Sequence, residues 1–115
     1  MNYTPYAPYN SGAIDYYVTS DGGNYVLGTF DSKGNPVVRY VGRAENLNKR
    51  LKEHLKEFGY CKWFGIIYEP EEMRRYYNEC YDYHYFGGSA KLKNKIHPDK
   101  PEGLRWWSEC PVCGR

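Results

Sequence analysis

The chain has 115 residues, which is enough for one compact domain and excludes a multidomain arrangement. Its formal net charge of +2 is too small to indicate a nucleic-acid partner, but the charge is unevenly distributed. Basic residues are absent before Lys33 and dominate from there to Lys62. No apolar run could span a bilayer and the N-terminus lacks signal-peptide features, so we expect a cytoplasmic protein with no membrane contact.

The start of the chain is rich in tyrosine and poor in aliphatic side chains. Prolines and a glycine within residues 1–12 predict a flexible or surface-lying arm. Residues 14–19 are compatible with a short edge strand. We therefore interpret residues 1–20 as an N-terminal arm or edge strand that precedes the main domain.

A β-hairpin is predicted next. Residues 24–30 and 36–41 are rich in β-branched and aromatic side chains, which is typical of strands. Residues 31–35, with the sequence DSKGN, have the composition of a hairpin loop. We expect two antiparallel strands, the second of which ends at Gly42.

After this hairpin the hydrophobic period changes from that of a strand to that of a helix. The apolar positions on the predicted helix face are Leu47, Leu51, Leu55 and Phe58. Asn46 is suited to cap the start of this helix, and Gly59 is suited to a left-handed position after its end.

A third strand is predicted at residues 62–68, followed by a second helix from Pro70 to about Tyr85 that stops at the Gly87-Gly88 pair. The element order predicts an α+β fold in which helices flank a three-stranded antiparallel sheet. The main domain would cover residues 21–98. Residues 99–115 would form a C-terminal tail that contains a CxxC motif.

Two tripeptides on the predicted hairpin resemble those of a known family. Gly23-Asn24-Tyr25 and Tyr40-Val41-Gly42 are similar to the two triplets of the GIY-YIG nuclease family. The resemblance continues through the two predicted helices and the segment beyond them, at Arg50, His54, Glu79 and Asn94. It extends from about Gly23 to His97.

The resemblance implies an endonuclease that hydrolyses phosphodiester bonds of nucleic acid, with DNA favoured over RNA and Mg²⁺ or Mn²⁺ as cofactor. The implied catalytic residues are Tyr25, Tyr40, Arg50, His54 and Glu79. Glu79 would bind the Mg²⁺ ion, and Tyr25 or Tyr40 would act as base or orient the water, with help from His54. The residues expected to bind substrate are Gly42, Arg43, Lys49, His84 and Asn94. Tyr16 and Tyr17 stay open as alternatives to Tyr25.

These residue types also suit phosphodiester hydrolysis on chemical grounds. The reaction needs an aligned water, removal of its proton, and positive charge where negative charge develops. A single carboxylate such as Glu79 can hold one hydrated divalent ion. Arg50 offers a planar fork that matches two phosphate oxygens.

Each of these residues also has a purely structural interpretation. Arg50 and His54 lie one helical turn apart and could border the core. Glu79 follows Arg75 by four residues and could form a surface ion pair. The alternative function is a non-catalytic nucleic-acid-binding or zinc-stabilised interaction module on the same fold. The catalytic hypothesis requires that Glu79 share one concave surface with both tyrosines.

The tail carries a second set of candidate residues. Cys110 and Cys113 have the spacing of a zinc knuckle, but a tetrahedral Zn²⁺ site needs two further ligands. The candidates for these ligands are Cys61, Cys80, His84 and His97, and the cysteines could equally be free thiols. Trp106 and Trp107 could cover the core or stack on bases. Because no reader domain is evident, specificity could come from a partner protein or a homo-oligomer.

Overall fold

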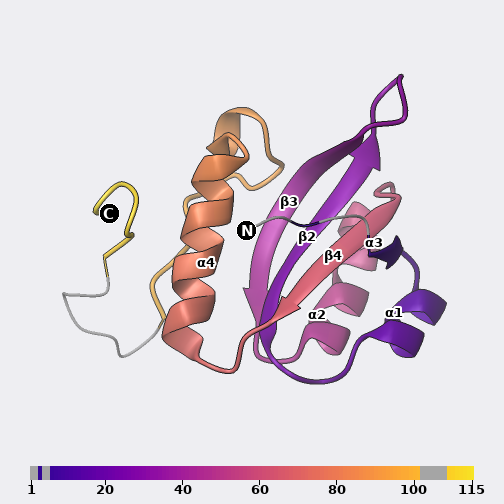
Figure 1. Ribbon diagram of the computed structural model, residues 1–115, viewed down its shortest axis with the longest axis horizontal. Helices are drawn as coiled ribbons and strands as arrows, with labels where there is room; N and C mark the ends of the chain where they lie inside the picture. Colours follow the sequence, from indigo (N-terminus) through magenta and orange to yellow (C-terminus); the bar gives the residue numbers. More distant parts are fainter. Residues whose placement is uncertain (1–2, 4–5, 102–108) are drawn as a thin grey trace.

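The fold is α+β, with an antiparallel sheet between two layers of helices (Figure 1). The computed structural model describes residue 3, residues 6–101 and residues 109–115, so Trp106 and Trp107 lie outside the described residues. Its elements are β1 (Ala7–Pro8), α1 (Ser11–Tyr17), β2 (Gly23–Phe30), β3 (Pro36–Ala44), α2 (Leu47–Glu53), α3 (Leu55–Phe58), β4 (Trp63–Tyr68), α4 (Glu72–Tyr85) and a 3-10 turn at Gly88–Ala90. None of the helices in this part of the chain is both long and apolar enough to cross a bilayer.

The sheet has the strand order β1-β4-β2-β3, and all its pairs are antiparallel. The predicted fold class is confirmed, but the predicted number of strands is wrong by one. The additional strand is the two-residue β1, in which Ala7 pairs with Phe64 and Pro8 with Trp63. β3 lies at the opposite edge of the sheet.

Alternation along β2 divides the core between the two faces of the sheet. Tyr25 and Leu27 point to the face covered by α1 and α2, where they pack against Leu51 and other buried side chains. Val26 points to the other face, where it packs with Trp63 beneath α4. Burial of each large aliphatic side chain stabilises the fold by about 2 kcal/mol.

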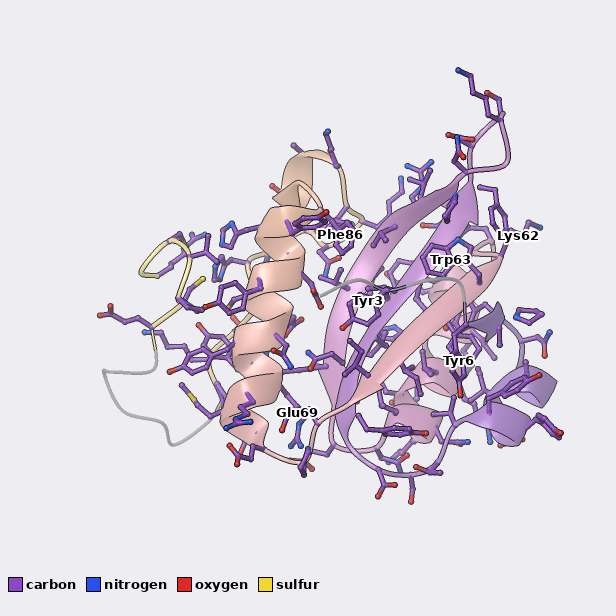
Figure 2. All side chains as sticks on the ribbon, in the orientation of Figure 1. Tyr3, Tyr6, Lys62, Trp63, Glu69 and Phe86 are labelled. Carbon is purple, nitrogen blue, oxygen red and sulfur yellow. The ribbon has the colours of Figure 1, made fainter. Side chains whose placement is uncertain are left out.

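Two tyrosines in the described part of the N-terminal arm pack onto the sheet. Tyr3 packs against the α4-side core beside Trp63, and its hydroxyl donates to the carboxylate of Asp82 on α4 at 3.0 Å (Figure 2). Tyr9 is buried, and its hydroxyl donates to the carbonyl of Leu51 at 2.7 Å. The arm is therefore held on both faces of the sheet.

The strand predicted at residues 14–19 is wrong, because this segment is mostly the helix α1. Asn10 caps α1 by accepting a hydrogen bond from the Ala13 N–H at 2.8 Å. Ile14 and Val18 are four residues apart and both buried, which is a helical spacing rather than a strand alternation. The edge strand of this region lies earlier, at β1.

The hairpin is confirmed, with a loop at residues 31–35, although β3 continues two residues beyond Gly42 to Ala44. The Asn46 cap is also confirmed, since its side chain accepts from the Lys49 N–H at 3.0 Å. The predicted helix is divided at His54 into α2 and α3.

The left-handed conformation predicted for Gly59 is wrong, because its φ is −61°. Glycine is required there by space instead, since a Cβ would lie 2.7 Å from the carbonyl oxygen of Leu55. The predicted stop of α4 is confirmed, because Gly87 has a φ of +100° that disfavours other residues.

Candidate functional site

A cleft crosses the β3 edge of the sheet, between α2 on one side and α4 with residues 94–101 on the other. We call it the β3 cleft, and we call residues 94–101 its wall segment. The predicted catalytic residues that line it are Tyr25, Tyr40, Arg50 and Glu79. The predicted substrate-binding residues that line it are Gly42, Arg43, Lys49 and Asn94. Glu79 therefore shares one concave surface with both tyrosines.

Gly42 makes room for Tyr25. The two residues are direct partners across β2 and β3, so their side-chain positions face the same side of the sheet. A Cβ on Gly42 would lie 2.4 Å from the Tyr25 hydroxyl oxygen, which is impossible without displacing the ring. Gly42, predicted to bind substrate, thus has a structural reason to be glycine.

Tyr25, Tyr40 and His54 form an aromatic cluster in which the two tyrosines line the cleft and His54, also predicted to be catalytic, does not. The Tyr25 hydroxyl lies 2.7 Å from His54 Nε2, a hydrogen bond that the hydroxyl donates when the histidine proton is on Nδ1. The His54 ring centroid lies 5.2 Å from that of Tyr40, and Phe58 packs against both rings. His54 is placed by the end of α2, where its N–H donates to the Arg50 carbonyl at 3.1 Å.

Burial sets the protonation of this cluster. Burial and the neighbouring Arg50 guanidinium lower the pKa of His54 below its ordinary 6.5. Burial raises the pKa of Tyr25 well above 10.0, and burial with the nearby Glu79 raises that of Tyr40. At neutral pH the histidine is therefore an uncharged acceptor, and both phenols keep their protons.

Glu79 projects from α4 and is paired with Arg43. One Arg43 nitrogen forms a short ion pair with the Glu79 carboxylate, and the other donates to the carbonyl of Asp99 at 2.6 Å. Burial raises the pKa of Glu79, and the Arg43 charge opposes this shift. Arg43, predicted to bind substrate, is thus the counter-ion of Glu79.

The structural interpretation of Glu79 as a partner of Arg75 is wrong. The Arg75 guanidinium donates instead to the carbonyls of Glu69 and Pro70, each at 2.9 Å. It closes the start of α4 and leaves Glu79 facing the β3 cleft.

The charged residues of α2 differ from Glu79 in exposure. Arg50 is half exposed and lies 3.4 Å from Glu53 in an ion pair within the helix. Lys49 also lines the cleft and follows the Asn46 cap. Since exposed pairs of this kind contribute under about 1 kcal/mol, the Arg50 side chain is free to take another partner.

Asn94 is engaged with the backbone of β3. Its amide oxygen accepts from the Val41 N–H at 3.0 Å, and its amide nitrogen donates to the Val41 carbonyl at 2.8 Å. The Lys93 N–H donates to the Arg39 carbonyl at 2.6 Å. These bonds satisfy the free edge of the sheet, so the Asn94 amide positions the wall segment rather than facing a ligand.

Asn24, the middle residue of the first triplet, has a role that the sequence did not indicate. It is fully buried, donates to the Arg75 carbonyl at 2.9 Å, and accepts from the Asn78 amide at 3.1 Å. It therefore ties β2 to α4, which presents Glu79. The available signal was a polar residue at the centre of an otherwise apolar strand.

Tyr16 and Tyr17 both belong to α1 and do not line the β3 cleft. The Tyr16 side chain is 81% exposed, and Tyr17 packs edge-on against Tyr6 with ring centroids 5.6 Å apart. The geometry therefore favours Tyr25 over both alternatives.

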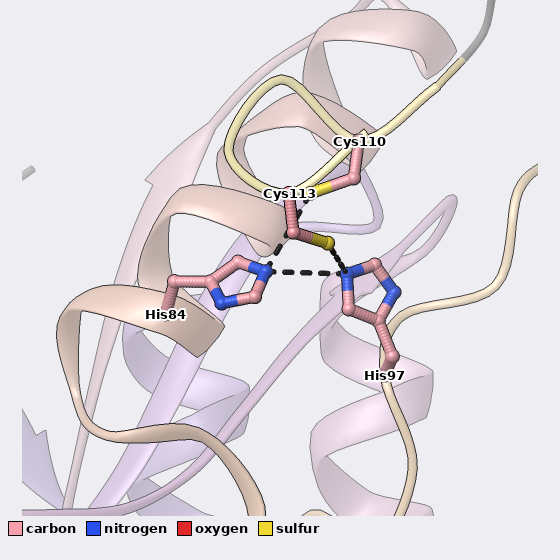
Figure 3. A group of neighbouring side chains, drawn as sticks. All are labelled: His84, His97, Cys110 and Cys113. Carbon is pink, nitrogen blue, oxygen red and sulfur yellow. Dashed lines mark hydrogen bonds between the residues drawn. The ribbon is translucent and has the colours of Figure 1, made fainter. Parts of the chain in front are cut away.

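A second group of polar side chains lies at the C-terminal end of α4, and we call it the His/Cys cluster (Figure 3). Its members are His84, His97, Cys110 and Cys113, whose ligand atoms all lie within 4.8 Å of one another. This cluster could bind a metal such as zinc. His84, predicted to bind substrate, belongs to this cluster and does not line the β3 cleft.

The other two candidate zinc ligands lie elsewhere. Cys61 is buried in the core beneath α1 and α2. Cys80 is buried beside Cys110 and Tyr76, where it is a packing neighbour of the cluster rather than a member. The structure thus brings His84 and His97 close to the two cysteines of the CxxC motif.

Comparisons with protein-family models, with curated proteins and with solved structures find no match to this chain. The basis for a functional inference is therefore the chemistry of the β3 cleft and of the His/Cys cluster.

Proposed function

We propose that this chain is a metal-dependent endonuclease of the GIY-YIG type, which hydrolyses phosphodiester bonds of DNA in preference to RNA at the β3 cleft. The observation that supports the proposal most strongly is the convergence of Tyr25, Tyr40, Arg50 and Glu79 on one cleft. These residues come from two strands and two helices, so the convergence depends on the whole fold.

Tyr25 and His54 are suited to remove the proton of the attacking water. Because burial raises the pKa of Tyr25, a free tyrosinate would be costly. A relay avoids it: the water proton passes to the Tyr25 oxygen while the Tyr25 proton passes to His54 Nε2, 2.7 Å away. Tyr40, which is less buried, would orient the water from its position beside Tyr25.

Arg50 and Lys49 would receive the phosphate. Arg50 lies beside both tyrosines and exchanges its weak pairing with Glu53 for two non-bridging phosphate oxygens. Lys49, on the same helix, adds positive charge that attracts the backbone of the nucleic acid.

Glu79 would hold the catalytic Mg²⁺ or Mn²⁺. A carboxylate facing a cleft fits a hard divalent cation that keeps several waters. When bound, such an ion polarises the phosphate and neutralises the leaving oxygen. Arg43 is paired with Glu79 in the structure, so the Arg43 side chain would have to move away from Glu79 when the ion binds. The Asp99 carbonyl, which already accepts a hydrogen bond from Arg43, would still be available as its partner.

Cleavage of plasmid, single-stranded DNA and RNA in Mg²⁺ or Mn²⁺ tests this proposal. We expect metal-dependent cutting that Glu79→Gln and Arg50→Ala each reduce by at least ~100-fold, since both act on charge that develops in the transition state. Glu71→Gln is the matched control, because Glu71 is the N-cap residue of the same helix and pairs with Arg74 on the surface. Equal cutting by wild type and Glu79→Gln would contradict the proposal.

A non-catalytic nucleic-acid-binding or zinc-stabilised interaction module is the second candidate. It is favoured by the fact that Glu79 is already paired with Arg43. Salt-sensitive binding of DNA without cutting would select it. A partner protein or homo-oligomer could supply specificity to either form.

A further inference from the structure

We propose that the His/Cys cluster is a tetrahedral Zn²⁺ site that fastens the C-terminal tail and the wall segment of the β3 cleft to α4. The inference is independent of the proposed nuclease activity. Only its consequence for cutting rests on the proposed function.

Three of the distances between the ligand atoms match those of a zinc tetrahedron. The two Nε2 atoms of His84 and His97 are 3.2 Å apart, Cys110 Sγ is 3.6 Å from His84 Nε2, and Cys113 Sγ is 3.4 Å from His97 Nε2. A Zn²⁺ ion at ~2.0–2.1 Å from nitrogen and ~2.3 Å from sulfur separates two nitrogens by about 3.3 Å and nitrogen from sulfur by about 3.6 Å. All four atoms lie within 4.8 Å of one another, so small side-chain movements would let one ion contact all of them.

The ligand types select zinc over the hard cation proposed for the cleft. Two thiolates and two imidazoles suit Zn²⁺, whereas Mg²⁺ requires oxygen ligands. His97 is also oriented for metal binding, since its Nδ1 lies 2.9 Å from the Pro98 carbonyl and leaves Nε2 to face the cluster.

The turn that carries Cys110 and Cys113 is closed by backbone hydrogen bonds. The Gly114 N–H donates to the Cys110 carbonyl at 2.9 Å, and the Cys110 N–H donates to the Arg115 carbonyl at 3.0 Å. Gly114 has a φ of +75°, which closes this turn with a residue that tolerates the left-handed region. This turn brings Cys110 and Cys113 together as two neighbouring ligands.

The four ligands come from three parts of the chain that are separate in the sequence. His84 belongs to the last turn of α4, His97 to the wall segment, and the cysteines to residues 109–115 (Figure 3). Among residues 109–115, Cys110 packs against Tyr76 and Cys80, whereas Val112 and Cys113 are exposed. An ion would therefore contribute much of the free energy that holds the tail in place.

The same ion would fix one wall of the cleft. Within the wall segment, Asn94 bonds to β3 and Asp99 accepts from Arg43, and His97 lies between these two points. Loss of the ion frees the His97 side chain and loosens the Asp99 contact. Because Arg43 is also the partner of Glu79, the zinc site acts on the proposed catalytic centre through this segment.

Metal content and Co²⁺ substitution of the full chain test the site. We expect about one zinc per chain after dialysis, and the visible absorption of tetrahedral thiolate-bound Co²⁺ after exchange. Cys113→Ser and His84→Ala should each weaken zinc binding more than 100-fold, because each removes a direct ligand. Loss of a residue that only hydrogen-bonds to a ligand already weakens metal binding by about 10–100-fold. Cys61→Ala is the matched control, because that thiol lies in the opposite core. A chain that binds no zinc, or variants that bind it as tightly as wild type, would overturn the site.

Hydrogen exchange before and after chelation tests the fastening role, with no reference to activity. Removal of zinc should expose the amides of residues 94–101 and 109–115 while those of β2 and β4 stay protected. Cys113 is exposed, so Cys113→Ser should give the same pattern without perturbing the core. Unchanged protection of the wall segment in the zinc-free chain would overturn this role.

Discussion

The β3 cleft and the His/Cys cluster are assembled in different ways. The cleft takes most of its side chains from regular strands and helices, and Tyr25 and His54 are fixed there by packing and a hydrogen bond. The cluster takes its side chains from a helix end, a loop segment and the tail. The strand and helix side of the cleft can therefore keep its geometry without a metal, whereas the cluster and the wall segment depend on the ion that we propose.

This contrast predicts that changes in the cleft affect chemistry most, and changes near the cluster affect order and stability. The largest effect is expected for Gly42→Ala. A methyl group 2.4 Å from the Tyr25 hydroxyl forces the ring to move, so we expect about 1–3 kcal/mol lost from the free energy of unfolding and cutting reduced by at least ~1,000-fold. Urea unfolding and cleavage rates check this, with Gly12→Ala as control, because a Cβ there meets only Asn10 at 3.5 Å. Normal cutting by Gly42→Ala would show that Tyr25 does not need its observed position.

The next effect concerns His54. Since its pKa lies below 6.5, we expect kcat/KM to be constant near pH 7 and to fall as the pH drops below 6.5 and the acceptor becomes charged. The unfolded chain binds this proton more tightly than the folded one, so the free energy of unfolding falls over the same range. His54→Gln should lower cutting by ~100-fold and remove this acid limb. A pH–rate profile that the substitution leaves unchanged would rule out the proton relay.

A smaller effect is expected for Asn94→Ala, which removes two buried hydrogen bonds to Val41. We expect a loss of about 1–3 kcal/mol in the free energy of unfolding, with zinc binding retained, because the four ligands are intact. Thermal unfolding and metal content measure the two quantities. Loss of zinc binding in this variant would mean that the His/Cys cluster depends on the hydrogen bonds between Asn94 and β3.

The smallest effect is expected for Glu53→Gln. The change frees Arg50 from an exposed ion pair, so stability should change by less than about 1 kcal/mol and DNA should bind slightly more tightly at low salt. Binding measured across a salt series checks this. Weaker binding by Glu53→Gln would mean that the ion pair positions Arg50 for the phosphate.

Much of the fold was predictable because its signals are local. The Asn46 cap, the hairpin loop and the Gly87 stop each depend on neighbouring residues, and all three are present in the structure. β1 was not predictable, since Ala7 and Pro8 become a strand only by pairing with β4. α1 was missed because its seven residues offer few turns in which a helical period can be recognised.

The candidate site, like the fold, was predictable only where its signals are local. Both triplets lie on a predicted hairpin, so their proximity followed from strand pairing, but the pairing of Tyr25 with Gly42 depends on a register shift between Leu27 and Gly28. The Arg43 partner of Glu79 was not predictable, because it depends on how α4 packs against the sheet. The choice of His84 and His97 over Cys61 and Cys80 also required the tertiary arrangement.

We propose that a structural zinc and a catalytic magnesium occupy two separate sites. Cleavage of DNA by the zinc-loaded chain, with and without added Mg²⁺ and beside Glu79→Gln, tests it most directly. We predict that cutting requires Mg²⁺, and that Glu79→Gln keeps its zinc but does not cut. Cutting by the zinc-loaded chain without Mg²⁺, or by Glu79→Gln at the wild-type rate, would contradict the account.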